Sequence, residues 1–112
     1  MKIKLEVKKR ILIVRLFGEL DHHGADEVRA KIEAAIRDRG TVNVIFDMSG
    51  LEFMDSSGIG LIVGRYKLVT PMGGRIYVSC PGNGIGRILK MSGTDKLVTI
   101  FKSTEEAIKA AL

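Results

Sequence analysis

The residues most able to do chemistry gather in two short segments of the sequence. One, residues 18–23, reads Gly-Glu-Leu-Asp-His-His, and the other, residues 53–60, reads Phe-Met-Asp-Ser-Ser-Gly-Ile-Gly. Each follows an apolar, branched run that predicts a β-strand. In open α/β sheets, ligands and partners meet the loops at the carboxyl ends of the strands. We therefore expect both segments to be loops at one functional edge of a sheet.

Ser56 and Ser57 lie where a helix is predicted to begin. A serine at such a position commonly accepts a hydrogen bond from a free backbone N–H of the first turn, which stabilises the helix by about 1 kcal/mol. A second use is as a phosphoacceptor, because the free N–H groups and the positive end of the helix tolerate a phosphate. The residue types alone leave both interpretations open.

Three neighbours of these serines are further candidates for contact with a partner. Gly58 and Gly60 each cost a helix about 1 kcal/mol, so we expect another backbone to approach closely, from within the domain or from a partner. Met54 adds a soft apolar side chain to a loop that we predict to be exposed. It either packs under the start of the helix or contacts a protein partner.

Catalytic and nucleotide-binding patterns fit the sequence poorly. The glycine-rich stretches at 58–64 and 82–86 miss the dinucleotide-binding spacing, and there is neither a Gly-Lys-Ser/Thr loop nor a Gly-x-Ser-x-Gly elbow. His22 and His23 are adjacent, so their side chains diverge. Asp21, Asp47 and Asp55 would have to meet a serine and a histidine in a geometry that the sequence does not fix. We predict no catalytic residue, metal or cofactor, with a hydrolase or nucleotide-binding protein as the alternative.

Length and composition predict one globular domain spanning residues 1–112. The hydrophobic fraction of 46% and charged fraction of 28% exclude wholesale disorder. The single cysteine, Cys80, excludes an internal disulfide and is expected to be a small core residue. The longest apolar run, residues 59–63, is too short to cross a bilayer, and charges interrupt the N-terminus where a signal peptide would need an apolar run. We expect a cytoplasmic protein.

The net charge of +5 raises the question of nucleic-acid binding. The basic residues are spread along the chain, and the densest run, Lys8–Arg10, falls at a predicted hairpin turn. In the first predicted helix the charges alternate in sign, and Glu27/Lys31 and Glu33/Arg37 have the spacing of ion pairs on a solvated face. The four Phe and two Tyr residues do not alternate with basic ones as a base-stacking surface would. We expect no direct binding of nucleic acid.

Hydrophobic periodicity predicts an α/β fold. Strands are expected at residues 2–8, 11–17, 43–47, 75–80 and 98–101, and helices at 24–39, 57–70, 83–92 and from Ser103, which forms a capping box with Glu106. The helix at 57–70 is apolar nearly all round and should be the most buried one. The order β-β-α-β-α-β-α-β-α predicts a mixed, mostly parallel sheet of four to five strands with about four helices.

At the two segments described first, the sequence resembles the STAS domains of bacterial anti-sigma factor antagonists, and most closely those that act on anti-sigma-F factors in sporulation. The resemblance covers nearly the whole chain. It is carried by residues 15–23, by residues 53–60, by Gly-Arg-Tyr-Lys at 64–67 and by Met-Ser-Gly at 91–93. The Asp-Ser-Ser-Gly stretch alone recurs across the wider family, whereas its combination with the other segments is much more specific.

The resemblance implies a regulated binding protein rather than an enzyme. An anti-sigma factor that is also a serine kinase, bringing its own ATP and Mg²⁺, would phosphorylate Ser56, with Ser57 as the alternative acceptor. The unphosphorylated form would bind that anti-sigma factor and release the sigma factor, and a phosphoserine phosphatase would restore it. Asp21 belongs to the loop that meets the kinase. The other residues predicted to contact the partner are His22, Met54, Asp55, Ser57, Gly58 and Gly60.

Two alternatives remain at this stage. One is an antagonist that serves a stress-response sigma factor, and the other is an unregulated STAS binding module in which Ser56 merely caps a helix. No membrane contact is expected. The oligomeric state is open, with a monomer as the working expectation.

Overall fold

The computed structural model of the protein describes residues 1–112 and has the predicted order of elements. The strands are β1 (Lys2–Lys8), β2 (Ile11–Leu20), β3 (Asn43–Met54), β4 (Ile76–Ser79) and β5 (Thr99–Phe101). The α-helices are α1 (His22–Arg39), α2 (Ser56–Val69), α3 (Asn83–Met91) and α4 (Thr104–Ala111). Two short 3₁₀ helices, η1 (Thr70–Met72) and η2 (Thr94–Lys96), complete the set.

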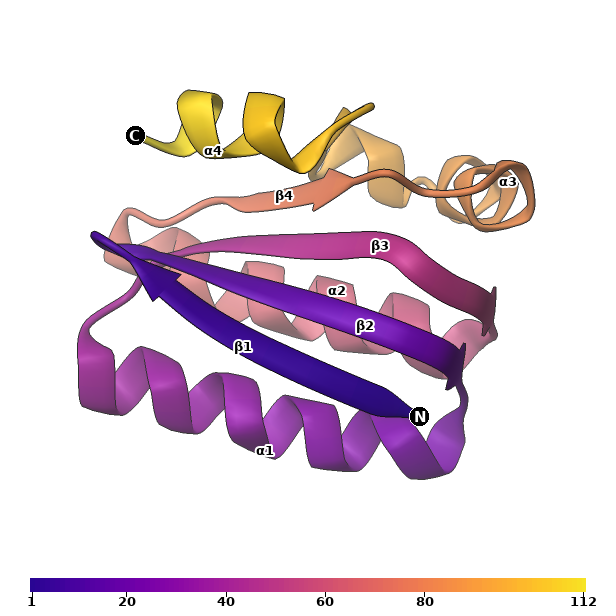
Figure 1. Ribbon diagram of the computed structural model, residues 1–112, viewed down its shortest axis with the longest axis horizontal. Helices are drawn as coiled ribbons and strands as arrows, with labels where there is room; N and C mark the ends of the chain where they lie inside the picture. The colour runs from indigo at the N-terminus through magenta and orange to yellow at the C-terminus, as the bar shows by residue number, and fades with distance from the viewer.

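The five strands form one sheet in the order β1-β2-β3-β4-β5. β1 and β2 pair antiparallel through a tight hairpin, in which Lys9 has a positive φ of 58°. The pairs β2–β3, β3–β4 and β4–β5 are all parallel. The predicted mixed and mostly parallel sheet is therefore confirmed. The carboxyl ends of β2 and β3 lie together at one end of the molecule, next to the starts of α1 and α2 (Figure 1).

Helices cover the two faces of the sheet unequally. The larger hydrophobic cluster joins one face to α1, α2 and α3 and includes Leu12, Phe46 and Ile62, which are fully buried. Helix α4 lies on the other face of the sheet (Figure 1), and the smaller cluster joins that face to it through Ala107 and Ala111. Successive side chains of a strand point to opposite faces of the sheet, and here helices cover both faces. The central strands β2 and β3 are therefore nearly continuous apolar runs.

Strands β2 and β3 are longer than the sequence predicted. Residues 48–55, between the strand predicted at 43–47 and the helix predicted at 57–70, were expected to be a connection. Instead the ladder continues across a register shift between Arg15 and Phe17, where Gly50 pairs with Phe17. A Cβ on Gly50 would lie 2.3 Å from Cδ1 of Phe17, so the missing side chain makes room for that ring. The glycine therefore marks an irregularity inside a strand rather than its end.

The helix ends follow the expected chemistry. Gly40, which ends α1, has a positive φ of 67°, and the Ser103 hydroxyl accepts a hydrogen bond of 3.1 Å from the backbone N–H of Glu106. On the surface of α1, Lys31 pairs with Glu27 at 3.1 Å as its spacing predicts. Glu33 was predicted to pair with Arg37, and this prediction is wrong. Glu33 pairs instead with Arg65 of α2, at 3.1 Å. This second pair joins two helices instead of adding to one.

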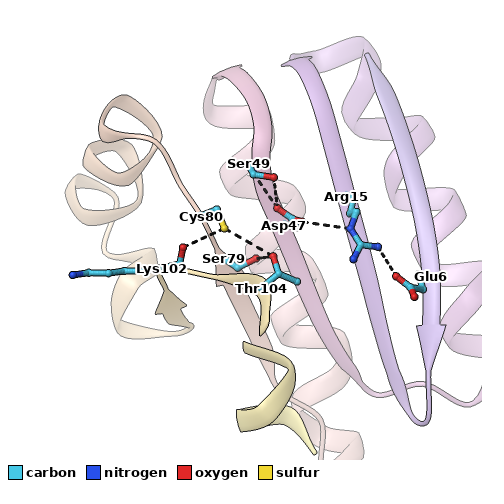
Figure 2. Close-up of polar contacts among 8 residues, drawn as sticks. All are labelled: Glu6, Arg15, Asp47, Ser49, Ser79, Cys80, Lys102 and Thr104. Carbon is cyan, nitrogen blue, oxygen red and sulfur yellow. Dashed lines mark hydrogen bonds and ion pairs between the residues drawn. The ribbon is translucent and has the colours of Figure 1, made fainter. Parts of the chain in front are cut away.

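Cys80 is not the core residue that the sequence indicated. It follows β4 with a positive φ of 55° and is only partly buried. Its Sγ atom lies 3.2 Å from the Lys102 carbonyl oxygen, to which the thiol donates (Figure 2). None of the helices combines the length and apolar character that a membrane span requires.

Candidate functional site

The two segments predicted to carry function meet at the carboxyl ends of β2 and β3, on the right in Figure 1. β2 runs to Leu20 and β3 to Met54, so a single residue, Asp21 or Asp55, separates each strand from its helix. The Asp55 backbone N–H donates to the Leu20 carbonyl at 3.4 Å, which joins the two chain segments directly. The predicted edge is therefore present, although most of the segment 18–23 and residues 53–54 are strand or helix rather than loop.

Both aspartates cap the helices that they precede. Asp21 has an extended backbone, and its Oδ1 accepts a hydrogen bond of 2.9 Å from the Gly24 N–H. Asp55 has the same conformation, and its Oδ1 accepts one of 2.8 Å from the Ser57 N–H. Asp55, and not a serine, is thus the N-cap of α2. The interpretation of Ser56 or Ser57 as the cap is wrong.

The hydrogen bond from Gly24 lowers the pKa of the Asp21 carboxyl below its usual range. A lowered pKa in the folded state means that the charged carboxylate favours folding. This contribution is present at a pH above the ordinary carboxyl pKa of about 4. It is lost as the pH falls through the lowered value of the folded protein.

With the cap supplied by Asp55, the Ser56 hydroxyl has no part in holding the helix. Ser56 is the first residue of α2 and is exposed, whereas Ser57 is partly buried. At this position the free N–H groups of the helix and its macrodipole create a positive local field. An exposed hydroxyl in such a field is accessible to an enzyme and is well placed to carry a phosphate.

Met54 and Gly58 are buried, so the prediction that Met54 lies in an exposed loop is wrong, and its other interpretation, packing under the start of the helix, is confirmed. Met54 is only 1% exposed, and a Cβ on Gly58 would lie 2.1 Å from its Cγ. The Met54 side chain thus occupies the space that Gly58 leaves free under the start of α2. The close approach predicted for a glycine is therefore internal at Gly58. Gly60, by contrast, is exposed with open space beside it, and so remains available to a partner.

Phe53 is a surface residue that sequence reasoning missed. Its side chain is 48% exposed, immediately before the buried Met54. A second register shift, between Gly18 and Glu19, allows Leu51 and Met54 both to face inward and leaves Glu52 and Phe53 outside. The available signal was the large aromatic next to the charged Glu52, but only the register of β3 decides which side chain is exposed.

The remaining predicted contacts lie on the accessible surface. His22 is exposed at the start of α1, and its ring centroid lies 5.9 Å from that of His23. Asp21 is exposed and Asp55 is partly exposed. The accessible site therefore consists of Asp21, His22, Phe53, Asp55, Ser56 and Gly60, with Ser57 behind them.

Asp47 does not take part in this site. Its Oδ1 accepts hydrogen bonds from the Ser49 hydroxyl at 2.8 Å and the Ser49 N–H at 3.0 Å, and its Oδ2 lies 3.5 Å from Arg15 Nε. Arg15 in turn pairs with Glu6, so these side chains form a polar row across β1, β2 and β3 (Figure 2). The hydrolytic alternative needs an aspartate that orients a histidine, and Asp47 is committed to other partners.

Comparison with known proteins gives a consistent result. Residues 2–107 match the family model described as the STAS domain. The anti-sigma F factor antagonist of Paenibacillus polymyxa is 41% identical over 108 residues, which cover 96% of this chain and 92% of that protein. The anti-sigma-B factor antagonist of Staphylococcus aureus is 26% identical over 105 residues, or 94% of this chain and 96% of that protein.

Two solved structures of one relative match the fold. The anti-sigma factor antagonist SpoIIAA in its unphosphorylated form is 33% identical, with a TM-score of 0.80 over 97% of this chain and 96% of that one. The phosphorylated form of SpoIIAA, a Bacillus cell fate determinant, is 35% identical, with the same TM-score of 0.80 over 99% and 100% of the two chains.

The capping geometry gives a first prediction. Asp55→Ala should lower the free energy of unfolding by about 1 kcal/mol, because the Ser57 N–H loses its acceptor. Ser56→Ala and Ser57→Ala should each change it by less than about 0.5 kcal/mol, since neither hydroxyl caps the helix. Urea unfolding followed by circular dichroism measures all three. A loss for either serine variant as large as that for Asp55→Ala would show that a serine shares the capping role.

Proposed function

Because this chain belongs to the STAS-domain family, as an anti-sigma factor antagonist, we propose that phosphorylation of Ser56 switches its binding to an anti-sigma factor off. The unphosphorylated protein binds the anti-sigma factor and releases the sigma factor for transcription. The observation that carries the proposal is the exposed Ser56 at the positive end of α2, whose cap Asp55 already supplies. Asp21, which caps the adjacent helix, contributes to the same binding surface.

The sigma factor served is proposed to be of the sigma-F type, which places the protein in sporulation. The relative named for anti-sigma F is 41% identical, whereas the relative named for anti-sigma-B is 26% identical over a similar length. An antagonist of a stress-response sigma factor would be expected to have the higher sequence identity to the relative named for anti-sigma-B. This difference in identity favours the sporulation assignment.

Ser56 is favoured over Ser57 as the acceptor because it is the more exposed of the two. A kinase must bring the serine oxygen into line with the transferred phosphorus of ATP, which requires free access to the hydroxyl. Ser56 is exposed, while Ser57 is partly buried and lies against a hollow between α1 and α2. The partner kinase supplies ATP and Mg²⁺, so this chain contributes only the hydroxyl and needs no cofactor. We propose that this kinase and the opposing phosphatase act on the protein in the cytoplasm.

The phosphate is tolerated by the fold that carries it. It adds about −1.5 to −2 charges at the N-terminus of a helix, where the macrodipole favours negative charge. α2 is 14 residues long, so its dipole is well developed. The phosphorylated and unphosphorylated forms of SpoIIAA match this chain with the same TM-score. We infer that phosphorylation acts without a large change of shape.

The same charge excludes the partner. In the complex the phosphate would be covered by a protein surface that matches a neutral hydroxyl, and a buried charge without good partners costs several kcal/mol. Asp55, the residue before Ser56, adds repulsion between like charges at short range. Since each 1.4 kcal/mol changes affinity tenfold, a loss of affinity of about 10²–10³-fold follows from electrostatics alone.

Ser56→Ala tests the acceptor. The variant should bind the anti-sigma factor with nearly unchanged affinity but gain no phosphate when incubated with the partner kinase and ATP. Ser57→Ala is the matched control and should gain one phosphoryl group, a mass increase of about 80 Da, located by peptide mass spectrometry. Stoichiometric phosphorylation of Ser56→Ala would instead assign the acceptor to Ser57. Absence of phosphorylation in the unaltered chain would favour an unregulated binding module.

Ser56→Asp tests the charge mechanism. A carboxylate in place of the hydroxyl should weaken binding to the anti-sigma factor by about 10- to 100-fold, because it carries about half the charge of a phosphate. Ser56→Asn has a similar size without the charge and should lose much less affinity. Isothermal titration calorimetry gives both values. Equal affinities for the Asp and Asn variants would show that size, not charge, governs the switch.

Asp21→Asn separates recognition from stability. Asparagine is as good an N-cap as aspartate, so the thermal unfolding midpoint should stay close to that of the unaltered chain at pH 7. Binding to the anti-sigma factor should fall about tenfold or more, because the exposed carboxylate no longer meets the partner. Asp21→Ala, which removes cap and charge together, should also lower stability. Unchanged binding by the Asn variant would confine Asp21 to its structural role.

A further inference from the structure

A cavity of about 290 Å³ lies between the first half of α1 and residues 57–65 of α2. Its polar lining comes from His22, Asp26 and Arg29 of α1 and from Ser57 and Arg65 of α2, and the exposed Gly60 forms part of its wall. The cavity adjoins the site of the proposed switch, but the switch itself does not use the two arginines. Arg65 belongs to the Gly-Arg-Tyr-Lys segment, which the proposed switch does not involve.

Arg65 is a buried cation whose hydrogen bonding is incomplete. The residue is only 8% exposed, and its Nη2 pairs with Glu33 Oε2 at 3.1 Å. Its Nε and Nη1 atoms are shielded from water and have no acceptor. Buried donors without partners are rare in folded proteins, and an unseen water or ion is one recognised explanation. The guanidinium therefore lacks acceptors on the two atoms that Glu33 does not reach.

A second positive charge lies near the first. Burial lowers the pKa of Arg65; the Glu33 carboxylate opposes this shift, and the charge of Arg29 adds to it. Arg29 itself pairs only with Asp26, at 3.2 Å, and both side chains are more than half exposed. Such an exposed pair is worth little, about 0–1 kcal/mol, so Arg29 can readily exchange Asp26 for another acceptor.

We propose that this cavity binds a compact oxyanion, a phosphate or carboxylate group, between the guanidinium groups of Arg29 and Arg65. The two local carboxylates, Asp26 and Glu33, each reach a single nitrogen of their arginine, which leaves the other donors for a ligand. Guanidinium groups match the geometry of these oxyanions and bind them through paired hydrogen bonds. Because Arg65 lines the cavity and its Nε and Nη1 have no acceptor in the protein, an oxyanion that reaches them would supply the missing one. The positive end of α2, next to Ser57, adds to the attraction.

Inorganic phosphate is the first probe, added to the whole chain at constant ionic strength with chloride as the exchanged ion. Nuclear magnetic resonance should show saturable shifts of the Arg29 and Arg65 Nε–H signals and of the Ser57 and Gly60 amides. The expected dissociation constant is about 1–10 mM, as for a small ligand held by two arginines. Acetate in a second titration distinguishes a general oxyanion site, which binds both probes, from a phosphate site. If neither phosphate nor acetate causes saturable shifts of these signals, the proposal is overturned.

Variants tie the binding to the two arginines. Arg65→Met keeps the length and apolar stem of the side chain and should weaken phosphate binding about tenfold or more. Arg29→Met, on the surface of α1, should have a similar effect with little risk to folding, so it carries the test if Arg65→Met does not fold. Arg87→Met, at an exposed position of α3, is the control and should leave binding unchanged. If Arg29→Met binds phosphate as the unaltered chain does, the shifts come from another site.

Discussion

The hydrogen bonds from the carboxylates of Asp21 and Asp55 to the first turns of α1 and α2 determine what the neighbouring residues can do. Each aspartate satisfies a backbone N–H that the helix itself cannot satisfy. Because Asp55 holds the start of α2, Ser56 has no structural task and its hydroxyl can be modified without loss of the cap. If the serine held the helix, every phosphorylation event would also remove part of the fold's stability, and the binding and folding equilibria would be coupled.

Contacts between the ends of β2 and β3 fix the positions of the two capping aspartates relative to each other. One hydrogen bond, from the Asp55 N–H to the Leu20 carbonyl, links the segments just before the two caps. Beneath them, Met54 fills the space that Gly58 leaves open, so the first turn of α2 packs directly on the end of β3. The exposed residues of the site thus lie directly above buried, well-packed side chains. Under the proposed mechanism, a phosphate added at Ser56 would therefore alter recognition without altering the packing beneath it.

The sequence was informative about the order of elements and less so about their ends. Alternating apolar positions in residues 2–8 and the helical stripe ended by Gly40 led to correct elements, because burial of one face imposes its period on the sequence. The end of β3 was missed because Ser49-Gly50 favours a turn as much as a strand irregularity. Its true cause, the ring of Phe17 opposite Gly50, lies on another strand.

The same limit applies in the site: Gly58 and Gly60 look alike in the sequence, yet only Gly58 meets another side chain. Which of Phe53 and Met54 is exposed likewise depends on pairing with β2, a long-range contact that local residue types do not encode.

The negative charges around Ser56 would give the proposed phosphorylation a large effect on binding. In the proposed complex, Asp21 and Asp55 would present carboxylates to the anti-sigma factor, whose surface would then need donors suited to those two charges. A phosphate adds about two further negative charges within the same few ångströms. Unless the partner can offer additional donors there, the new charge is desolvated without compensation, and specificity arises from this penalty rather than from lost contacts. The free protein pays no such penalty, since water and the start of α2 both solvate the phosphate. In the proposed mechanism, the switch therefore needs only the difference between a Ser56 phosphate in water and the same phosphate covered by the partner.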